Sequence, residues 1–224
     1  MMKELISLIF PPKCIFCSKI IDIKSDIEIC RDCYKLIPFV ERSSIVPFGI
    51  PGDTGWCDGV ICACRYTGIV RNSLIRYKFY GKSGFCRAFG RLMAEKIKST
   101  AEYREFDIIL SVPLHKRRER MRGYNQSLLI SRILSKELML PEKSKILTRK
   151  RETHTQSLLP RDKRRSNLLG AFEVKRADEI KDKTVLLVDD IMTTGVTLNE
   201  CSKVLKEAGA KRVIAAVVSS GREF

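Results

Sequence analysis

Two adjacent carboxylates stand beside a turn of hydroxyl side chains and glycine, and together they offer two kinds of ligand contact. Asp189 and Asp190 follow the apolar run 185–188, which indicates a parallel strand buried on both faces. The turn after them supplies backbone N–H groups, hydroxyls and a helix N-terminus, a combination that binds phosphate. The residues of this turn are Met192, Thr193, Thr194, Gly195, Val196 and Thr197. Because carboxylates repel phosphate, the acidic pair is expected to face hydroxyls or a divalent cation on the same ligand.

The strand, the acidic pair and the turn form one continuous pattern over 185–197. A sugar that carries a 5′-phosphate and vicinal hydroxyls would satisfy both halves of it, and Gly195 would let the backbone approach the anion closely. The pattern resembles the phosphoribosyl pyrophosphate (PRPP) motif of type I phosphoribosyltransferases. An ordinary strand-to-helix turn needs only one capping side chain, so we favour a ligand site.

Four cysteines near the N-terminus are spaced as two Cys-x-x-Cys pairs. Cys14 and Cys17 form the first pair, Cys30 and Cys33 the second, and the spacing is that of a zinc ribbon. Four thiolates close a tetrahedral Zn²⁺ shell without an open position, so we expect a structural ion. The metal would stabilise a segment that is too short to bury a large core.

The other five cysteines lack this spacing and are expected to be small buried hydrophobes. They are Cys57, Cys62, Cys64, Cys86 and Cys201. A second zinc site formed by Cys57, Cys62 and Cys64 stays an alternative. A chain rich in cysteine but without a secretory signal indicates reduced thiols in the cytoplasm. No apolar stretch is long enough to span a membrane, so we expect no membrane insertion.

The remaining pattern predicts an α/β fold in which a parallel sheet is flanked by helices. Hydrophobic periodicity places strands at 59–66 and 107–112, and helices at 69–80, 87–98, 124–140 and after the turn, the last one stopped by Gly209. We therefore predict a zinc-ribbon domain over 1–38, a linker over 39–58 and a type I phosphoribosyltransferase-like domain over 59–224. The end of a parallel strand is the place where such sheets bind ligands.

Positive charge is concentrated in one part of the chain. Residues 115–167 carry 16 Lys and Arg against 5 Asp and Glu, and so hold +11 of the formal net charge of +16. We expect two basic loops here, both close to the phosphates at the Asp189 end of the sheet. The candidate residues are Lys116, Arg117, Arg118, Arg120, Arg122, Arg149, Arg164 and Arg165. Arginine side chains suit pyrophosphate and nucleic-acid phosphates equally well, so both ligands stay open.

In their order along the chain, these features resemble the ComF family of competence-associated proteins. The resemblance rests on the four N-terminal cysteines, on 112–114 leading to 122–126, on 155–167 and on the acidic pair. It implies a type I phosphoribosyltransferase fold, a zinc finger and a role in handling transforming DNA. It also implies that the acidic pair faces the ribose hydroxyls and that 193–197 hold the 5′-phosphate. The loop after Val112 would contact pyrophosphate, and 149–167 would form a mobile flap.

Three functions fit these features. The first is a DNA-uptake protein that binds PRPP with Mg²⁺, binds single-stranded DNA and acts beside a DNA-uptake helicase or another competence protein. The second is a salvage-type phosphoribosyltransferase with a small-molecule acceptor, and the third is a PRPP-sensing regulator without turnover. The zinc ribbon and the basic charge favour the first, because a salvage enzyme needs neither. In a catalyst, pyrophosphate would leave the anomeric carbon through an oxocarbenium-like transition state, with the acidic pair in the catalytic site.

Overall fold

The computed structural model describes residues 10–41, 44–49, 55–151 and 168–222. The helices in these ranges are α2 (Arg31–Lys35), α3 (Gly68–Phe79), α4 (Cys86–Lys98), α5 (Lys116–Arg122), α6 (Gln126–Leu138) and α8 (Val196–Glu207). The strands are β1 (Gly59–Arg65), β2 (Ile108–Ser111), β3 (Leu147–Arg149), β4 (Phe172–Val174), β5 (Thr184–Met192) and β6 (Arg212–Ser220). Across the described ranges, no helix combines the length and apolarity that crossing a membrane requires.

A parallel sheet with the strand order β1-β6-β5-β2 forms the centre of the structure. β5 and β6 pair along their full length, from Thr184 opposite Arg212 to Met192 opposite Ser220. Nearly all of their side chains are buried, as expected for unbroken apolar strands that are covered on both faces. Because all the strands run in the same direction, their C-terminal ends meet at one edge, where the acidic pair lies.

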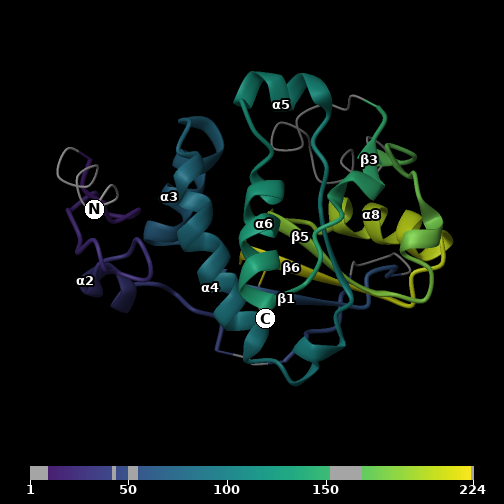
Figure 1. Cartoon of the computed structure of the whole chain (residues 1–224), viewed down its shortest axis with the longest axis horizontal. Helices are drawn as coiled ribbons and strands as arrows, with labels where there is room; N and C mark the ends of the chain where they lie inside the picture. Colours follow the sequence, from purple (N-terminus) through teal and green to yellow (C-terminus); the bar gives the residue numbers. More distant parts are fainter. Residues whose placement is uncertain (1–9, 42–43, 50–54, 152–167, 223–224) are drawn as a thin grey trace.

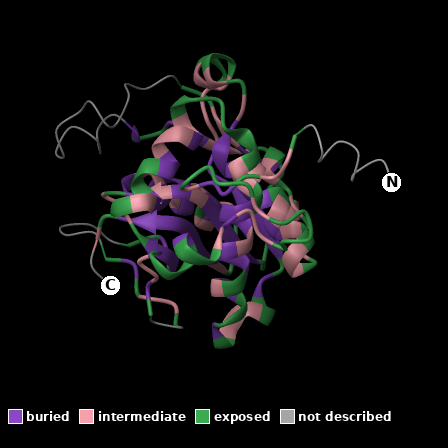
Figure 2. Cartoon of the chain, turned by 90° about the vertical axis from the view of Figure 1, so that its left-hand side faces the viewer, coloured by how far each residue is buried: buried purple, intermediate pink, exposed green. Residues whose placement is uncertain are grey.

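Helices cover both faces of this sheet (Figure 1). Leu186 and Val188 of β5 belong to a core shared with α3, α4 and α6, whereas Val185 and Leu187 belong to a second core with α8 and the paired strands β3 and β4. Figure 2 shows the buried residues gathered in the sheet and in the layers next to it. This is the predicted α/β architecture.

The predicted elements agree closely with the observed ones, with one correction at the acidic pair. α3, α4, α6, β1 and β2 begin and end within two residues of their predicted bounds. Gly209 follows α8 with a φ of 94°, the left-handed conformation of a helix stop. However, β5 continues to Met192, so the acidic pair lies inside the strand and not beyond it. Pairing with β6 extends the strand past its apolar run.

The N-terminal cysteine segment packs against α3 and α4. The Arg76 guanidinium on α3 donates to the carbonyl oxygens of Ile15 and Phe16 at 2.5 and 2.9 Å. Arg87 on α4 pairs with Glu28 at 2.6 Å. The side chains that this segment buries belong to the same core as α3 and α4. The segment is therefore fixed to the helical layer at several points.

Both outer edges of the sheet are covered by other parts of the chain. Phe39 and Val46 form antiparallel bridges to β1, and Phe48 is buried in the core on the α8 side. At the opposite edge, Glu142 forms a parallel bridge to Ile109 of β2. The segment that we predicted as a linker is thus paired to β1, and the domain boundaries at 38 and 58 stay predictions.

Candidate functional site

Asp190 lies at the C-terminal end of β5 and is almost fully buried, at 4% exposure. Its Oδ1 atom pairs with the Lys78 ammonium of α3 at 3.1 Å. Its Oδ2 atom is buried and accepts no hydrogen bond from the part of the chain that the structure describes. A buried carboxylate oxygen without a donor is costly, so this atom marks a place for a hydroxyl group or a cation.

Asp189 is held by two hydrogen bonds. Its Oδ1 atom accepts from Ser127 Oγ at 2.8 Å and from the Asp190 backbone N–H at 2.9 Å. Burial, and then the neighbouring Asp190 carboxylate, raise the pKa of Asp189 to about 7, although Lys78 and Ser127 act in the opposite direction. The acidic pair therefore carries charge that the fold stabilises only in part.

The hydrogen bond to Asp189 depends on how α6 begins. Asn125 caps this helix, because its side-chain oxygen accepts from the N–H groups of Ser127 and Leu128. The Asn125 amide nitrogen donates to the Val112 carbonyl at 3.1 Å and so joins the start of α6 to the end of β2. This cap places Ser127 in the first helical turn, beside β5.

We expect Asp189→Asn to stabilise the ligand-free protein, and to do so more at pH 8 than at pH 5. The Asp189 pKa is about 7 in the folded chain, against an ordinary value of about 4 in the unfolded chain. The free energy of unfolding therefore falls as the pH rises from about 4 to 7, because the folded chain keeps a proton that the unfolded chain releases. Asparagine does not titrate, so it removes this loss. Thermal unfolding should show a gain in Tm at pH 8 that is clearly larger than the gain at pH 5. A Tm difference that does not change with pH would contradict the assignment.

The turn after β5 has the conformation that its glycine requires, and glycine is needed here for two reasons. Gly195 precedes α8 with a φ of 79°. A Cβ atom at this position would lie 2.6 Å from the Phe48 ring. The Arg222 guanidinium donates to the Thr194 carbonyl and, at 2.6 Å, to the Gly49 carbonyl. The left-handed backbone and the packing of Phe48 thus both favour glycine, apart from any ligand.

A cavity of 370 Å³ lies beside the acidic pair. The turn residues that line it are Thr193 and Thr197, whereas Met192 and Val196 are buried in the core on the α8 side. Its basic lining residues are Lys78, Arg118, Arg122 and Arg149. The cavity therefore combines two carboxylates with four cations and four hydroxyl side chains, a set that suits an anion that also carries hydroxyl groups.

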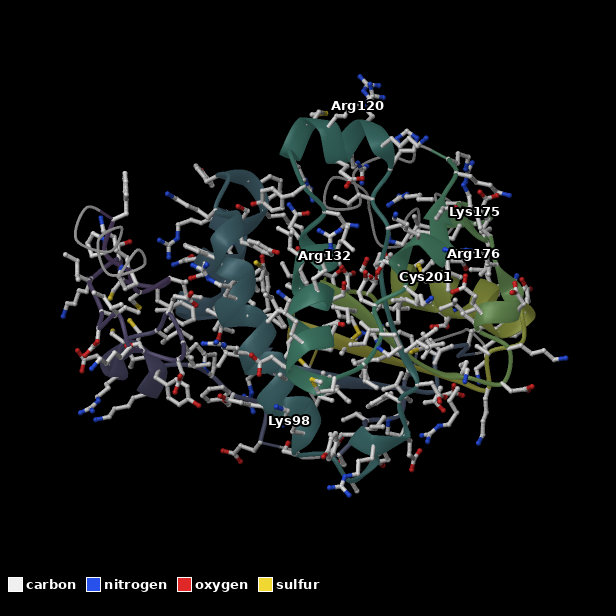
Figure 3. The ribbon with its side chains drawn as sticks, in the orientation of Figure 1. Lys98, Arg120, Arg132, Lys175, Arg176 and Cys201 are labelled. Atoms are coloured by element: carbon white, nitrogen blue, oxygen red, sulfur yellow. The ribbon has the colours of Figure 1, made fainter. Side chains whose placement is uncertain are left out.

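The first basic segment is a helix and not the loop that we predicted. The His115 side chain accepts from the Arg117 N–H at the start of α5, and Gly123 ends the helix with a φ of 81°. Lys116, Arg117 and Arg120 are exposed, whereas Arg118 and Arg122 are half-buried at the cavity. Figure 3 shows Arg120 projecting from the outer side of α5. One face of this helix thus lines the cavity and the other faces solvent.

The second basic segment is described only in part. Arg149 lies on β3, over the Phe172 ring at 5.4 Å, and lines the cavity. Burial, and then the nearby Arg118 charge, lower the pKa of Arg149 to about 10. Arg164 and Arg165, and most of the predicted flap, lie outside the described residues.

Among the cavity residues that the sequence analysis did not identify are Lys78, Phe79 and Ser127. Lys78 and Phe79 come from α3, far from the acidic pair in sequence, and only the packing of α3 on the sheet brings them to the cavity. Ser127 carried a local signal, because Asn125 two residues earlier is a typical helix cap. No comparable signal marked the other two.

The four N-terminal cysteines are clustered. All four Sγ atoms lie within 4.8 Å of one another. Cys17 and Cys30 have their Sγ atoms 3.7 Å apart, close to the value of about 3.8 Å that Zn–S bonds of about 2.3 Å give in a tetrahedron. Burial raises the pKa of Cys14, but N–H groups of the segment more than offset it and lower the pKa to about 7, whereas burial and the neighbouring cysteines raise the pKa of Cys33. The donor set therefore fits a zinc ribbon.

The remaining cysteines behave as packing residues. All except the half-buried Cys86 are buried, and burial raises the pKa of each of these thiols. Figure 3 marks Cys201 on α8, where it packs in the core. Among the residues that the structure describes, Cys57, Cys62 and Cys64 do not form a second metal-ligand cluster.

Comparisons with known proteins agree with this geometry. The model of a phosphoribosyl transferase domain matches residues 123–223. Competence protein F of Haemophilus influenzae is 37% identical over 142 residues, which cover 62% of each chain. DNA utilization protein YhgH of Escherichia coli K12 is 35% identical over 139 residues, 61% of this chain and 60% of that protein. The chain thus spans about three fifths of the length of these two relatives.

A third relative is matched over more of its length. Competence protein ComFC of Streptococcus pneumoniae is 34% identical over 166 residues, which cover 70% of this chain and 69% of that protein. Together with the domain match and the parallel sheet, this confirms a type I phosphoribosyltransferase-like fold with an N-terminal cysteine cluster. The chain therefore belongs to the ComF family.

Proposed function

We propose that the chain binds PRPP together with Mg²⁺ in the cavity beside β5, and binds single-stranded DNA on the basic surface of α5 next to it. The main support for binding of PRPP and Mg²⁺ is the buried Oδ2 atom of Asp190, which lacks a hydrogen-bond donor among the described residues. A ribose hydroxyl and a divalent cation are both ligands that would satisfy this atom.

Each part of PRPP has a chemically matched group in or beside the cavity. The acidic pair suits the ribose hydroxyls or the ion, and Lys78 holds Asp190 in place. Thr193 and Thr197, with the N-terminus of α8, suit the 5′-phosphate. The arginines of the cavity suit the pyrophosphate oxygens; they are Arg118, Arg122 and Arg149. Mg²⁺, when bound, would add positive charge for a departing pyrophosphate, and the domain match supports phosphoribosyl transfer as the reaction.

The cysteine cluster supports a structural Zn²⁺ in the N-terminal segment. A closed shell of four thiolates leaves no position for a substrate, so the ion would act on folding and not on the chemistry. It would fix the segment that Arg76 and Arg87 hold against α3 and α4.

The DNA half of the proposal rests on charge and on the relatives. The exposed face of α5 presents Lys116, Arg117 and Arg120 beside the cavity. The relatives are named as competence and DNA utilization proteins. We therefore expect phosphate contacts to a single strand, and a role beside other competence proteins such as a DNA-uptake helicase.

Two titrations test the proposal, one with PRPP and Mg²⁺ and one with a labelled single strand, followed by both ligands together. We expect binding in each separate titration. Competition between the ligands would place part of the strand on the cavity cations. If the chain fails to bind the strand at low salt but consumes PRPP with a small base or amine, it is a salvage-type enzyme.

We expect the DNA affinity to fall steeply with salt, and the triple variant Lys116→Ala, Arg117→Ala, Arg120→Ala to flatten that dependence. Each lost phosphate contact lowers the slope by about 0.7, so the three together should lower it by about 2. The matched control removes three exposed lysines at the opposite ends of the strands: Lys181, Lys183 and Lys211. Equal slopes for the two triple variants would show that α5 is not the DNA surface.

A further inference from the structure

An exposed aromatic ring stands at the cavity. Phe79 is the last residue of α3 and is 60% exposed, yet it lines the same cavity as the acidic pair. The inward side of α3 is already filled by Val70, Leu74 and Tyr77, which are buried. Phe79 therefore contributes little to the core, and a large apolar side chain is left in contact with water beside a phosphate-type cavity.

An arginine is held against this ring. The Arg122 guanidinium lies 5.2 Å from the centre of the Phe79 ring. Arg122 also donates to Gln126 Oε1 at 3.2 Å, which fixes the guanidinium between α5 and α6. The ring and the guanidinium are thus brought together from two helices and oriented before any ligand arrives.

A flat, half-exposed pair of this kind suits one chemical class of ligand. Aromatic rings stack on nucleobases, and the planar guanidinium stacks on them too while it contacts phosphate. The helix that carries Arg122 also carries other basic side chains, which can contact the phosphates of a nucleic acid. The acidic pair, which can contact a ribose, lines the same cavity as the ring and the guanidinium.

We infer that Phe79 and Arg122 form a stacking site for a nucleobase at the cavity. This inference rests on the proposed function and adds the base to the phosphates and ribose already assigned. Stacking uses only the flat face of a base, so we expect little sequence preference. The base comes either from a DNA strand or from a free nucleobase, and the test separates the two sources.

The test compares Phe79→Leu with the wild-type chain on two single strands of equal length, one with bases and one abasic. The wild-type chain should bind the strand with bases more tightly, by about 5- to 100-fold for one stacked base. Phe79→Leu should lose most of this preference and keep its affinity for the abasic strand, because leucine cannot stack but no charge has changed. Phe79→Trp should keep the preference. A third arm titrates free adenine in the presence of PRPP and Mg²⁺.

Tyr80→Leu is the matched control, because Tyr80 is 69% exposed and adjacent but does not line the cavity. An equal loss in Tyr80→Leu, or a wild-type chain that binds both strands equally and ignores adenine, would overturn the stacking site. Binding of adenine that depends on Phe79, without a preference between the strands, assigns the site to a free base. The wild-type titration with PRPP and Mg²⁺ separates the proposed PRPP site from the stacking site. If PRPP binds but no base stacks, the stacking site is wrong and the PRPP site is unaffected.

Discussion

Replacing Asp189 and Asp190 together by asparagine is expected to lower the affinity for PRPP with Mg²⁺ by at least about 100-fold, since each hydrogen bond to a charged group contributes about 1.5–3 kcal/mol. Asparagine keeps the size of both side chains but removes the charge that a cation or a ribose hydroxyl would meet. Both residues lie in the last part of β5 and line the cavity, and asparagine has the same shape as aspartate, so the sheet should fold. Calorimetry with PRPP and Mg²⁺ measures the effect.

Asp107→Asn provides the matched control for this double variant. Asp107 Oδ2 accepts from the Thr184 N–H at 2.7 Å. This contact lies at the N-terminal end of β5, opposite the end that carries the acidic pair. The substitution is chemically the same but lies far from the cavity, so the affinity for PRPP should stay as in the wild-type chain. Unchanged affinity in the double variant would rule out the acidic pair as the PRPP site.

Cys30→Ser is expected to lower the zinc content from one ion per chain to none. Three thiolates and a hydroxyl bind zinc far more weakly than four thiolates do, because the serine hydroxyl stays protonated at neutral pH. The segment 14–33 should then become sensitive to limited proteolysis. The sheet should still unfold cooperatively, because the core on its α8 side contains no side chain of the segment 14–33 and most of the other core comes from the sheet and its helices.

Cys86→Ser is the control for zinc, because Cys86 is half-buried on α4 and does not belong to the cluster. It should keep one zinc per chain. Full zinc content in Cys30→Ser, measured by metal analysis, would show that the four cysteines are not the ligands.

Local patterns of apolar residues predicted most of the fold, because they indicate which side chains of each segment are buried. The apolar run of β5 and the helical spacing in α4 and α6 each report burial within a single element. The extent of β5 could not be read in this way, because its last residues are held by pairing with β6 up to Ser220. Asp189 and Asp190 interrupt the apolar run, so the sequence pattern did not show that the strand continues beyond them.

The candidate site was predicted where its residues share one stretch of chain, or where clustered positive charge marked them, as for Arg118, Arg122 and Arg149. Asp189, Asp190, Thr193 and Thr197 follow one another and meet at the cavity. Phe79 and Lys78 reach it from α3 through packing, which one sequence does not reveal. The helix α5 was mistaken for a loop because its positive charge outweighed two local signals, the capping His115 and the helix-ending Gly123.

The bridges along β1 determine where the chain can be shortened. Phe39 and Val46 occupy the outer edge of that strand, and Phe48 fills the core on the α8 side. A fragment that begins at residue 59, the start of the predicted phosphoribosyltransferase-like domain, would leave β1 as an edge strand with unpaired N–H and C=O groups. Such an edge pairs with a second copy and leads to aggregation. A fragment without the cysteine cluster therefore has to begin no later than residue 38.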